Sequence, residues 1–193
     1  MTNQTPLPTN DIARPQYGGF WIRFGAYWLD ALILVPFSFL ITWLNGLNRE
    51  IVFFTFIPSL AVSIFFHVYC VKRWGGSPGK LICGLRIVST SLQAAGWREA
   101  WLRYSILLAV SLLSMAVYIY ALNQMSDAEY LRLSFLERSK RIVELGGSMQ
   151  TAATWLTQIW VWSEFIVLLT NKQRRALHDF VAGTLVIKNA KIA

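Results

Sequence analysis

Two charged side chains inside the first apolar stretch of the chain are the residues best placed to do chemistry. Arg23 and Asp30 lie seven positions apart, and together with Tyr27 they fall on one face of a helix with about 3.6 residues per turn. An aspartate inside a membrane span costs about 2.5 to 3.5 kcal/mol on insertion scales, so such carboxylates face inward and have partners. Asp30 is therefore a candidate ion or proton site. The alternative is a structural pair that holds helices in register.

A second carboxylate, Glu164, lies in the last apolar stretch, six residues before Thr170. At a helical rise of about 1.5 Å per residue, Asp30 and Glu164 are each roughly 9 to 12 Å inside the same edge of the apolar region. Two carboxylates at one level could share a proton or bind a cation, because like charges in a dry site oppose double ionisation. Glu164 is thus a candidate helper of Asp30, and structural pairing is again the alternative.

Four further side chains complete the candidate set. Arg23 is a counter-ion for Asp30 or for Asp179, which follows the last apolar stretch and is expected to act as a structural clamp. Lys80 is a possible partner of Asp179. His67 is a candidate proton relay because imidazole titrates near neutral pH. No spacing of His, Cys and acidic residues typical of a metal site occurs, so neither a metal nor another cofactor is expected.

The elements that must position these residues are membrane spans. The chain has 193 residues, of which 55% are hydrophobic, and its mean hydropathy is +0.43. These values indicate an integral membrane protein. Four apolar segments can each cross about 30 Å of hydrocarbon. We predict an all-α four-helix bundle, with a polar segment at residues 1–19 and one membrane domain at 20–193, whose spans are about 20–44, 51–71, 102–122 and 152–170.

The distribution of basic residues predicts the orientation. Thirteen of the eighteen lysines and arginines lie before or at the start of the first span, in the loop after the second, or in the tail at 171–193. The positive-inside rule therefore places both termini and the central loop in the cytoplasm of a multi-pass protein of the bacterial inner membrane. The net charge of +8 belongs to this pattern, and no motif supports nucleic-acid binding.

The loop between the third and fourth spans has its own helical signals. Ser126 and Glu129 form a capping-box pattern, and the pair Gly146-Gly147 is a stop signal. Apolar and charged residues alternate between them at helical spacing. We predict an amphipathic helix at 126–145 that lies on the outer membrane surface or caps the bundle, with a connector favoured over a binding role.

Two cytoplasmic segments share one pattern. The stretches RWGGSPGKLICGLRIVS at 73–89 and RRALHDFVAGTLVIK at 174–188 align without a gap, so that Lys80 matches Asp179, Gly84 matches Gly183 and Ile87 matches Val186. Each stretch follows a pair of spans and ends in a short apolar run. We expect the runs at 85–88 and 184–187 to pair as strands, because each is too short to fold alone.

Three motifs in this order resemble the RDD family of bacterial membrane proteins. They are WIRFGAYWLD with Arg23 and Asp30, the turn GGSPGKLICGLRIV, and RRALHDFVAG with Asp179. Family members are linked in part to sodium or other monovalent cation/proton exchange and in part to accessory roles beside larger membrane systems. The resemblance implies the architecture more firmly than the activity.

Two functions remain open at this point. The first is a small transporter or exchanger of monovalent cations and protons, acting as a homo-oligomer because four spans enclose little room. The second is an accessory or scaffold protein that docks a larger membrane complex. The chain carries no nucleophile elbow, phosphate-binding loop or dinucleotide fingerprint, so an enzyme is not expected. The lipid bilayer is a partner in either case.

Overall fold

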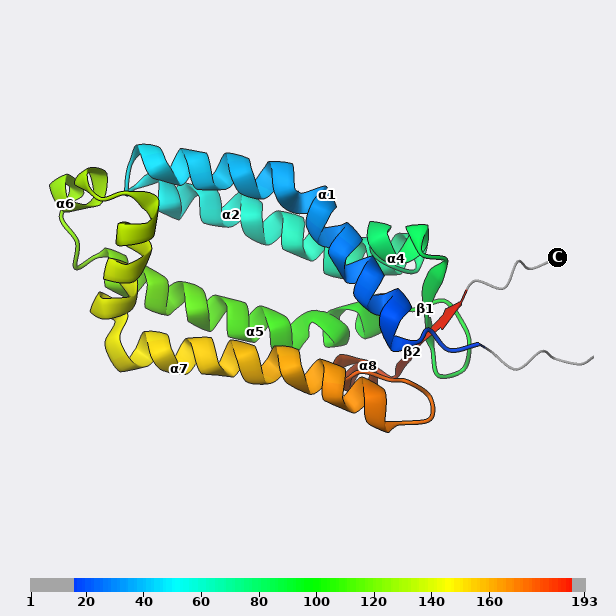
Figure 1. The fold of residues 1–193 in the computed structure, drawn as a ribbon. Coiled ribbons are helices and arrows are strands. Elements are labelled where there is room, and N and C mark those ends of the chain that lie inside the picture. The colour runs from blue at the N-terminus through cyan, green and yellow to red at the C-terminus, as the bar shows by residue number, and fades with distance from the viewer. Residues whose placement is uncertain (1–15, 189–193) are drawn as a thin grey trace, which may run out of the picture.

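Four long helices form the body of the protein in a computed structural model that describes residues 16–188. They are α1 (Phe20–Leu47), α2 (Ile51–Ile64) with its continuation, α5 (Trp97–Leu122) and α7 (Phe135–Thr170). All four are long and apolar enough to cross a membrane, which confirms the predicted spans. Figure 1 shows them as two hairpins, α1 with α2 and α5 with α7, lying side by side.

The second span is longer and less regular than its pattern predicts. α2 runs on through a π-helical turn, Phe65–Tyr69, into α3 (Cys70–Trp74). Pro36 and Pro58 lie inside α1 and α2 without ending either helix. Prolines are tolerated in this way in membrane helices because neighbouring groups satisfy the freed backbone atoms.

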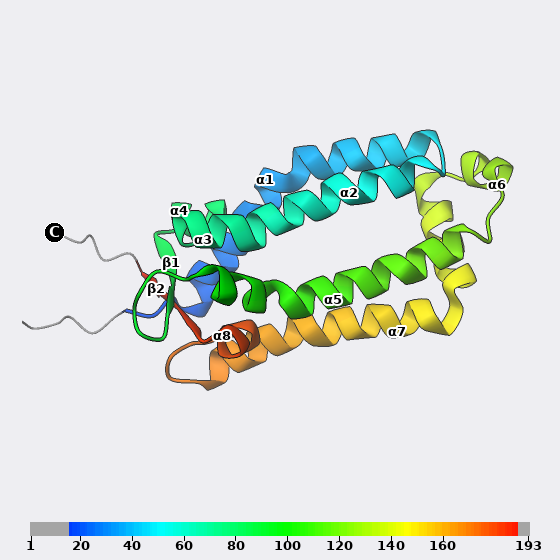
Figure 2. The ribbon, with the colours of Figure 1, turned by 180° about the vertical axis from the view of Figure 1, so that it is seen from behind.

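The connection between the third and fourth spans closes one end of the bundle. The predicted helix at 126–145 is present but broken into α6 (Asp127–Arg132) and the first turns of α7, Phe135–Gly146. Ser134 interrupts it by capping α7 and accepting from the backbone N–H of Glu137. At Gly147 the backbone adopts φ 52°, and the helix turns there into the span. We call α6 and the first turns of α7 the connector end; both hairpins reach it in Figure 2.

The opposite end, which we call the sheet end, consists of α4 (Pro78–Ile82), β1 (Leu85–Ser89), α8 (Leu177–Ala182) and β2 (Thr184–Lys188). The two strands pair antiparallel, with Ile87 opposite Val186, which confirms the predicted pairing. The chain also meets itself here, because the backbone N–H of Lys188 donates to the carbonyl of Gln16 at 2.8 Å. The predicted polar segment at 1–19 and the end of the tail at 171–193 lie largely outside the described residues.

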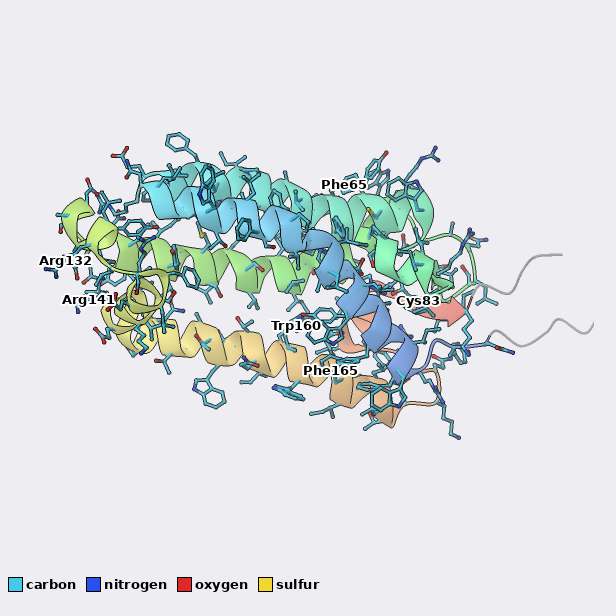
Figure 3. The ribbon with its side chains drawn as sticks, turned by 45° about the horizontal axis from the view of Figure 1, so that its top comes forward. Phe65, Cys83, Arg132, Arg141, Trp160 and Phe165 are labelled. Atoms are coloured by element: carbon cyan, nitrogen blue, oxygen red, sulfur yellow. The ribbon has the colours of Figure 1, made fainter. Side chains whose placement is uncertain are left out.

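The buried apolar residues form two separate clusters, one at each end. The cluster at the sheet end includes Leu85, Ile87 and Val186, and the one at the connector end includes Leu122 and Tyr130. At the sheet end Phe165 of α7 also lies against α1, with its ring centroid 5.7 Å from that of Phe20. Figure 3 shows Phe165 beneath α1, with Arg132 and Arg141 at the far end. The hairpins are thus joined at both ends.

Candidate functional site

The first polar group of the sheet end joins α1 to α4 through Asp30. The sequence Ser77-Pro78-Gly79 starts α4, with Ser77 extended and proline at the first helical position. One carboxylate oxygen of Asp30 accepts from the N–H of Gly79 at 2.7 Å, and the other accepts from the hydroxyl of Ser77 at 2.5 Å. Asp30 therefore fixes the start of α4 against the first span.

Gly79 makes this approach possible. A Cβ atom at position 79 would lie 2.3 Å from the carbonyl oxygen of Ala26 and 2.8 Å from the backbone nitrogen of Asp30. Only glycine therefore allows the turn and α1 to touch at this point.

Lys80 extends the group. Its Nζ atom donates to the Ser77 hydroxyl at 3.2 Å, so one serine oxygen lies between an ammonium and a carboxylate. Burial lowers the pKa of Lys80 from 10.5 to about 8, and the positive charge of Arg103 acts in the same direction. Desolvation disfavours the charged form of a lysine, so this ammonium can release its proton near physiological pH.

The second polar group is centred on Asp179 in α8. Its carboxylate is fully buried and forms ion pairs with Arg23 of α1, at 2.9 Å, and with Arg103 of α5. It also accepts from the N–H of Ala176 at 3.0 Å and from the hydroxyl of Thr184 at 3.2 Å. Burial opposes ionisation of Asp179, but the charge of Arg103, with that of Arg23, holds the pKa of the carboxyl far below its usual range.

His178 links this group to the fourth span. Its Nδ1 faces one carboxylate oxygen of Glu164, and its backbone N–H donates to the other oxygen at 3.1 Å. Its Nε2 lies 2.6 Å from Nη2 of Arg103, which has only protons to offer, so Nε2 accepts and the ring proton lies on Nδ1. Burial and the charge of Arg103 lower the pKa of His178 below its ordinary value, which agrees with this neutral form.

Asp30 and Glu164, which are expected at similar depth in the membrane, thus belong to different polar groups. Asp30 bonds to the turn at Ser77, whereas Glu164 bonds to His178, and the two have no hydrogen-bond partner in common among residues 16–188. Arg23 lies on Asp179 and makes no ion pair with Asp30 in that range. Lys80 makes its hydrogen bond to Ser77, and the charge of Asp179 reaches it only through space.

His67 lies apart from both groups. It is exposed on the second span, where its Nδ1 lies 2.9 Å from the carbonyl oxygen of Ser63 and its ring stacks on Tyr104 at 5.1 Å. No cluster of three or more metal-ligating side chains occurs in the described part of the chain.

Three residues of the site, Ser77, Arg103 and His178, are not candidates on sequence grounds. Arg103 could have been found by the signal that identifies Arg23, an arginine within the helix of a span, because α5 begins at Trp97 rather than near residue 102. Ser77 carried only a turn signal, and its contact with Asp30 joins positions 47 residues apart.

The two copies of the repeated turn-and-strand pattern, at 73–89 and 174–188, occupy equivalent positions. Each has a short helix followed by a glycine in the left-handed region, Gly84 with φ 66° and Gly183 with φ 64°, and then a strand. The short helix binds the first span of its own hairpin through a charged residue, Asp30 of α1 in one copy and Arg103 of α5 in the other. The signs of these charges are reversed between the copies.

The model of the RDD family matches residues 17–183 of this chain. The chain belongs to the RDD family. A search of the curated proteins and a search of the solved structures each returned no match. The three residues that give the RDD resemblance divide between the two polar groups: Arg23 and Asp179 form one ion pair, and Asp30 holds the turn that starts α4. In this RDD chain Arg23, Asp30 and Asp179 therefore form two separate contacts rather than one triad.

Proposed function

We propose that this membrane protein exchanges monovalent cations for protons, with Asp30, Ser77 and Lys80 as the site where the two compete. The observation that supports it is a half-buried ammonium, that of Lys80, separated from the half-buried carboxylate of Asp30 by one hydroxyl oxygen. Hard monovalent cations prefer oxygen ligands, which Asp30 and Ser77 supply. A cation at these oxygens would repel the charge of Lys80.

The charge balance defines the exchange. When Lys80 holds its proton, its ammonium balances the carboxylate of Asp30, and the site has no net charge to attract a cation. When the proton leaves to water, the site carries one negative charge and accepts one monovalent cation. Because the pKa of Lys80 is lowered to about 8 by burial, this switch falls within the physiological range. One proton is exchanged for one cation.

The ion-pair group around Asp179 has a supporting role in this proposal. Its two arginines and its neutral histidine hold α1, α5, α7 and α8 together beside the exchange site. Glu164 acts there through His178 rather than as a second ligand.

Reconstitution into sealed vesicles tests the proposal. With a sodium or potassium gradient and a trapped pH dye, the wild-type protein should move protons against the cation, and Asp30→Asn should abolish the exchange. Asp127→Asn is the matched control, since Asp127 is an exposed carboxylate paired with Arg49 at the connector end. Exchange that survives Asp30→Asn, or no exchange by folded wild-type protein with either cation, would rule the proposal out.

A scaffold role is the second candidate, and the exposure of the spans favours it. Only 6% of the most apolar stretch of α1 and 11% of that of α7 is buried inside the chain. Such surfaces suit packing against other membrane helices, in a homo-oligomer or in a larger complex. Crosslinking in native membranes should then trap a stoichiometric partner or a second copy, and only monomer at every crosslinker length would contradict this role.

A further inference from the structure

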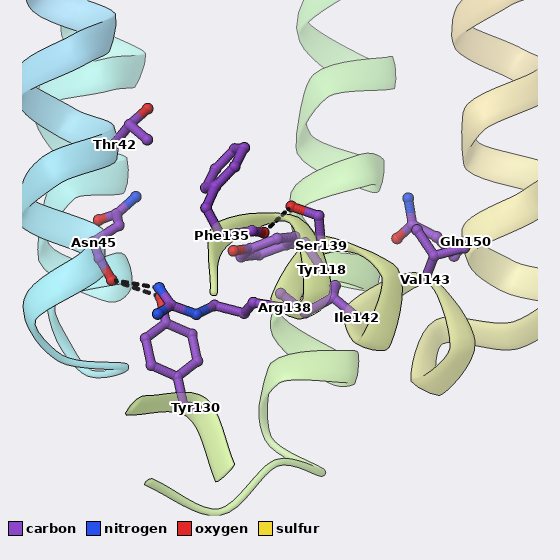
Figure 4. A pocket seen from close by; sticks show the side chains of 10 residues that line it. All are labelled: Thr42, Asn45, Tyr118, Tyr130, Phe135, Arg138, Ser139, Ile142, Val143 and Gln150. Atoms are coloured by element: carbon purple, nitrogen blue, oxygen red, sulfur yellow. Dashed lines mark hydrogen bonds between the residues drawn. The ribbon is translucent and has the colours of Figure 1, made fainter. Parts of the chain in front are cut away.

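A cavity of about 280 Å³ opens at the connector end, between α1, α5 and the first turns of α7 (Figure 4). Its size is close to the lower limit of ordinary small-molecule sites, about 300 to 1,000 Å³. Hydroxyl and amide groups share its wall with apolar side chains; they belong to Thr42, Asn45, Tyr118, Tyr130, Ser139 and Gln150. The cavity lies at the opposite end of the bundle from the proposed exchange site.

Arg138 supplies the charge of this cavity. Its guanidinium lies 3.9 Å from the centre of the Tyr130 ring and donates to the carbonyls of Leu133, at 3.2 Å, and Asn45, at 3.5 Å. An arginine carries five N–H donors, so these two bonds leave donors free. Its Nε atom is buried and has no partner within residues 16–188.

Four carboxylates of the connector end have partners other than Arg138. Arg141 binds Glu129 at 2.8 Å and Glu144 at 3.2 Å, and Arg49 binds Asp127 at 2.7 Å. Glu137 accepts from the hydroxyl of Ser134 at 2.7 Å. Arg138 makes no ion pair in the described part of the chain. Its charge is therefore open to an anion in the cavity, and a guanidinium binds carboxylate and phosphate oxygens especially well.

Gln150 supplies a second polar group that lacks a partner. Its Oε1 atom is buried and has no hydrogen-bond partner among the described residues. A buried acceptor without a donor is costly, by about 1 to 3 kcal/mol in proteins generally. The cavity therefore presents a positive group and, on another wall, an acceptor that needs an N–H or O–H.

We propose that this cavity binds a small ligand with an oxyanion for Arg138 and a hydrogen-bond donor for Gln150. A phosphate or carboxylate beside an ammonium or hydroxyl has this chemistry. Such a group is present both in zwitterionic phospholipid headgroups and in free soluble molecules. The apolar rim at Phe135, whose side chain is 68% exposed, suits the first source.

Thermal unfolding of the full chain in a neutral detergent, followed by tryptophan fluorescence, tests the proposal with two probes. Short-chain phosphatidylethanolamine represents the lipid source, and free phosphoethanolamine represents the soluble one. At about 100 times its Kd, a bound probe should raise Tm by ~5 °C. A shift with the lipid alone assigns the site to a headgroup at the membrane surface, and a shift with both shows that the headgroup chemistry suffices.

Variants locate the binding. Arg138→Gln should remove the Tm shift, and Gln150→Leu should reduce it. Arg132→Gln, an exposed arginine on α6 outside the cavity, should keep it. If Arg138→Gln does not fold, Gln150→Leu decides, since the Oε1 atom it removes makes no hydrogen bond within residues 16–188. No shift with either probe, an unchanged shift in Gln150→Leu, or an equal loss in Arg132→Gln would overturn the proposal.

Discussion

Asp179 forms ion pairs with two guanidinium groups away from solvent, because its side chain is fully buried and both arginines are less than a tenth exposed. Replacing a whole buried ion group by apolar residues is often neutral, but removing one member leaves the others charged and unpaired. Asp179 therefore stabilises the protein because it is the partner that the buried Arg23 and Arg103 would otherwise lack.

The substitution Asp179→Asn should lower the free energy of unfolding by about 3 to 5 kcal/mol, the range for breaking a buried ion pair. Asp127→Asn is the control, because Asp127 is 60% exposed and such pairs contribute only about 0 to 1 kcal/mol. The fall in Tm of each variant, measured in detergent, compares the two losses of stability.

The same residue gives a pH dependence. The pKa of Asp179 is lower in the folded protein than its ordinary value of 3.8, because Arg103 and Arg23 outweigh burial. Its contribution is therefore present above pH 3.8 and is lost as the pH falls below it. The Tm difference between wild type and Asp179→Asn should shrink below pH 4; a constant difference would contradict the ion-pair account.

Lys80 gives a second pH dependence of the same sign, in an alkaline range. Its pKa is lowered by burial from 10.5 to about 8, so between these values the unfolded chain binds more protons than the folded one and stability rises with pH. Wild-type Tm should rise from pH 8 towards pH 10, relative to Lys80→Met, which has no such group. Parallel curves for the two proteins would show that Lys80 titrates normally.

Sequence reasoning finds Arg23, Asp30 and Asp179 because a charge in or beside a membrane span needs a partner. The sequence does not show which residue is the partner of each charge. Ser77 and Arg103 reach these carboxylates across 47 and 76 positions, and only the packing of the hairpins brings them together. Similar depth in the membrane also does not bring Asp30 and Glu164 together, because depth along a helix says nothing about the direction in which each side chain points.

At the scale of elements, the short helix α4 is held against α1 by an approach that leaves no room for a side chain. Gly79→Ala would place a methyl group 2.3 Å from the carbonyl of Ala26, so α4 must move away from Asp30. We expect a loss of about 1 to 3 kcal/mol, as for overpacked cores. Gly25→Ala, where nothing lies within 4 Å, should be neutral or stabilising. Equal Tm values for the two variants would show that the contact is loose.

The strand pair allows a test of register. In a chain without its native cysteines, Ile87→Cys with Val186→Cys should form a disulfide, because these residues are directly opposite. Ile87→Cys with Leu185→Cys should not, since a shift of one residue turns the side chain to the other face. Mass spectrometry of unreduced peptides identifies the bond, and equal yields from both pairs would contradict the register.

The elements themselves follow well from the sequence. Span length, the Ser126 cap and the repeated turn predict the helices, the connector and the strands. The break at Ser134 escapes prediction, because the amphipathic pattern runs through it without interruption. The π-helical turn at Phe65–Tyr69 has no sequence signal of its own.

At the scale of the whole molecule, both ends join the two hairpins. Ion pairs, strand pairing and apolar contacts do so at the sheet end, and apolar packing with the pair Arg49–Asp127 does so at the connector end. The positive-inside pattern predicts that the sheet end faces the cytoplasm. Single cysteines at Ser91, beside β1, and at Ser139, on the connector end, should therefore react with a membrane-impermeant thiol reagent from opposite sides of sealed vesicles. Labelling of both from one side would contradict four spans.

The ion pairs of Asp179 also bear on the order of biosynthesis. Arg23 and Arg103 leave the ribosome long before Asp179, which follows the fourth span, and the strand that closes the sheet comes later still. Until Asp179 has been made, both arginines lack this counter-ion. The sheet end can therefore be completed only after the last dozen described residues, those of α8 and β2, have been made.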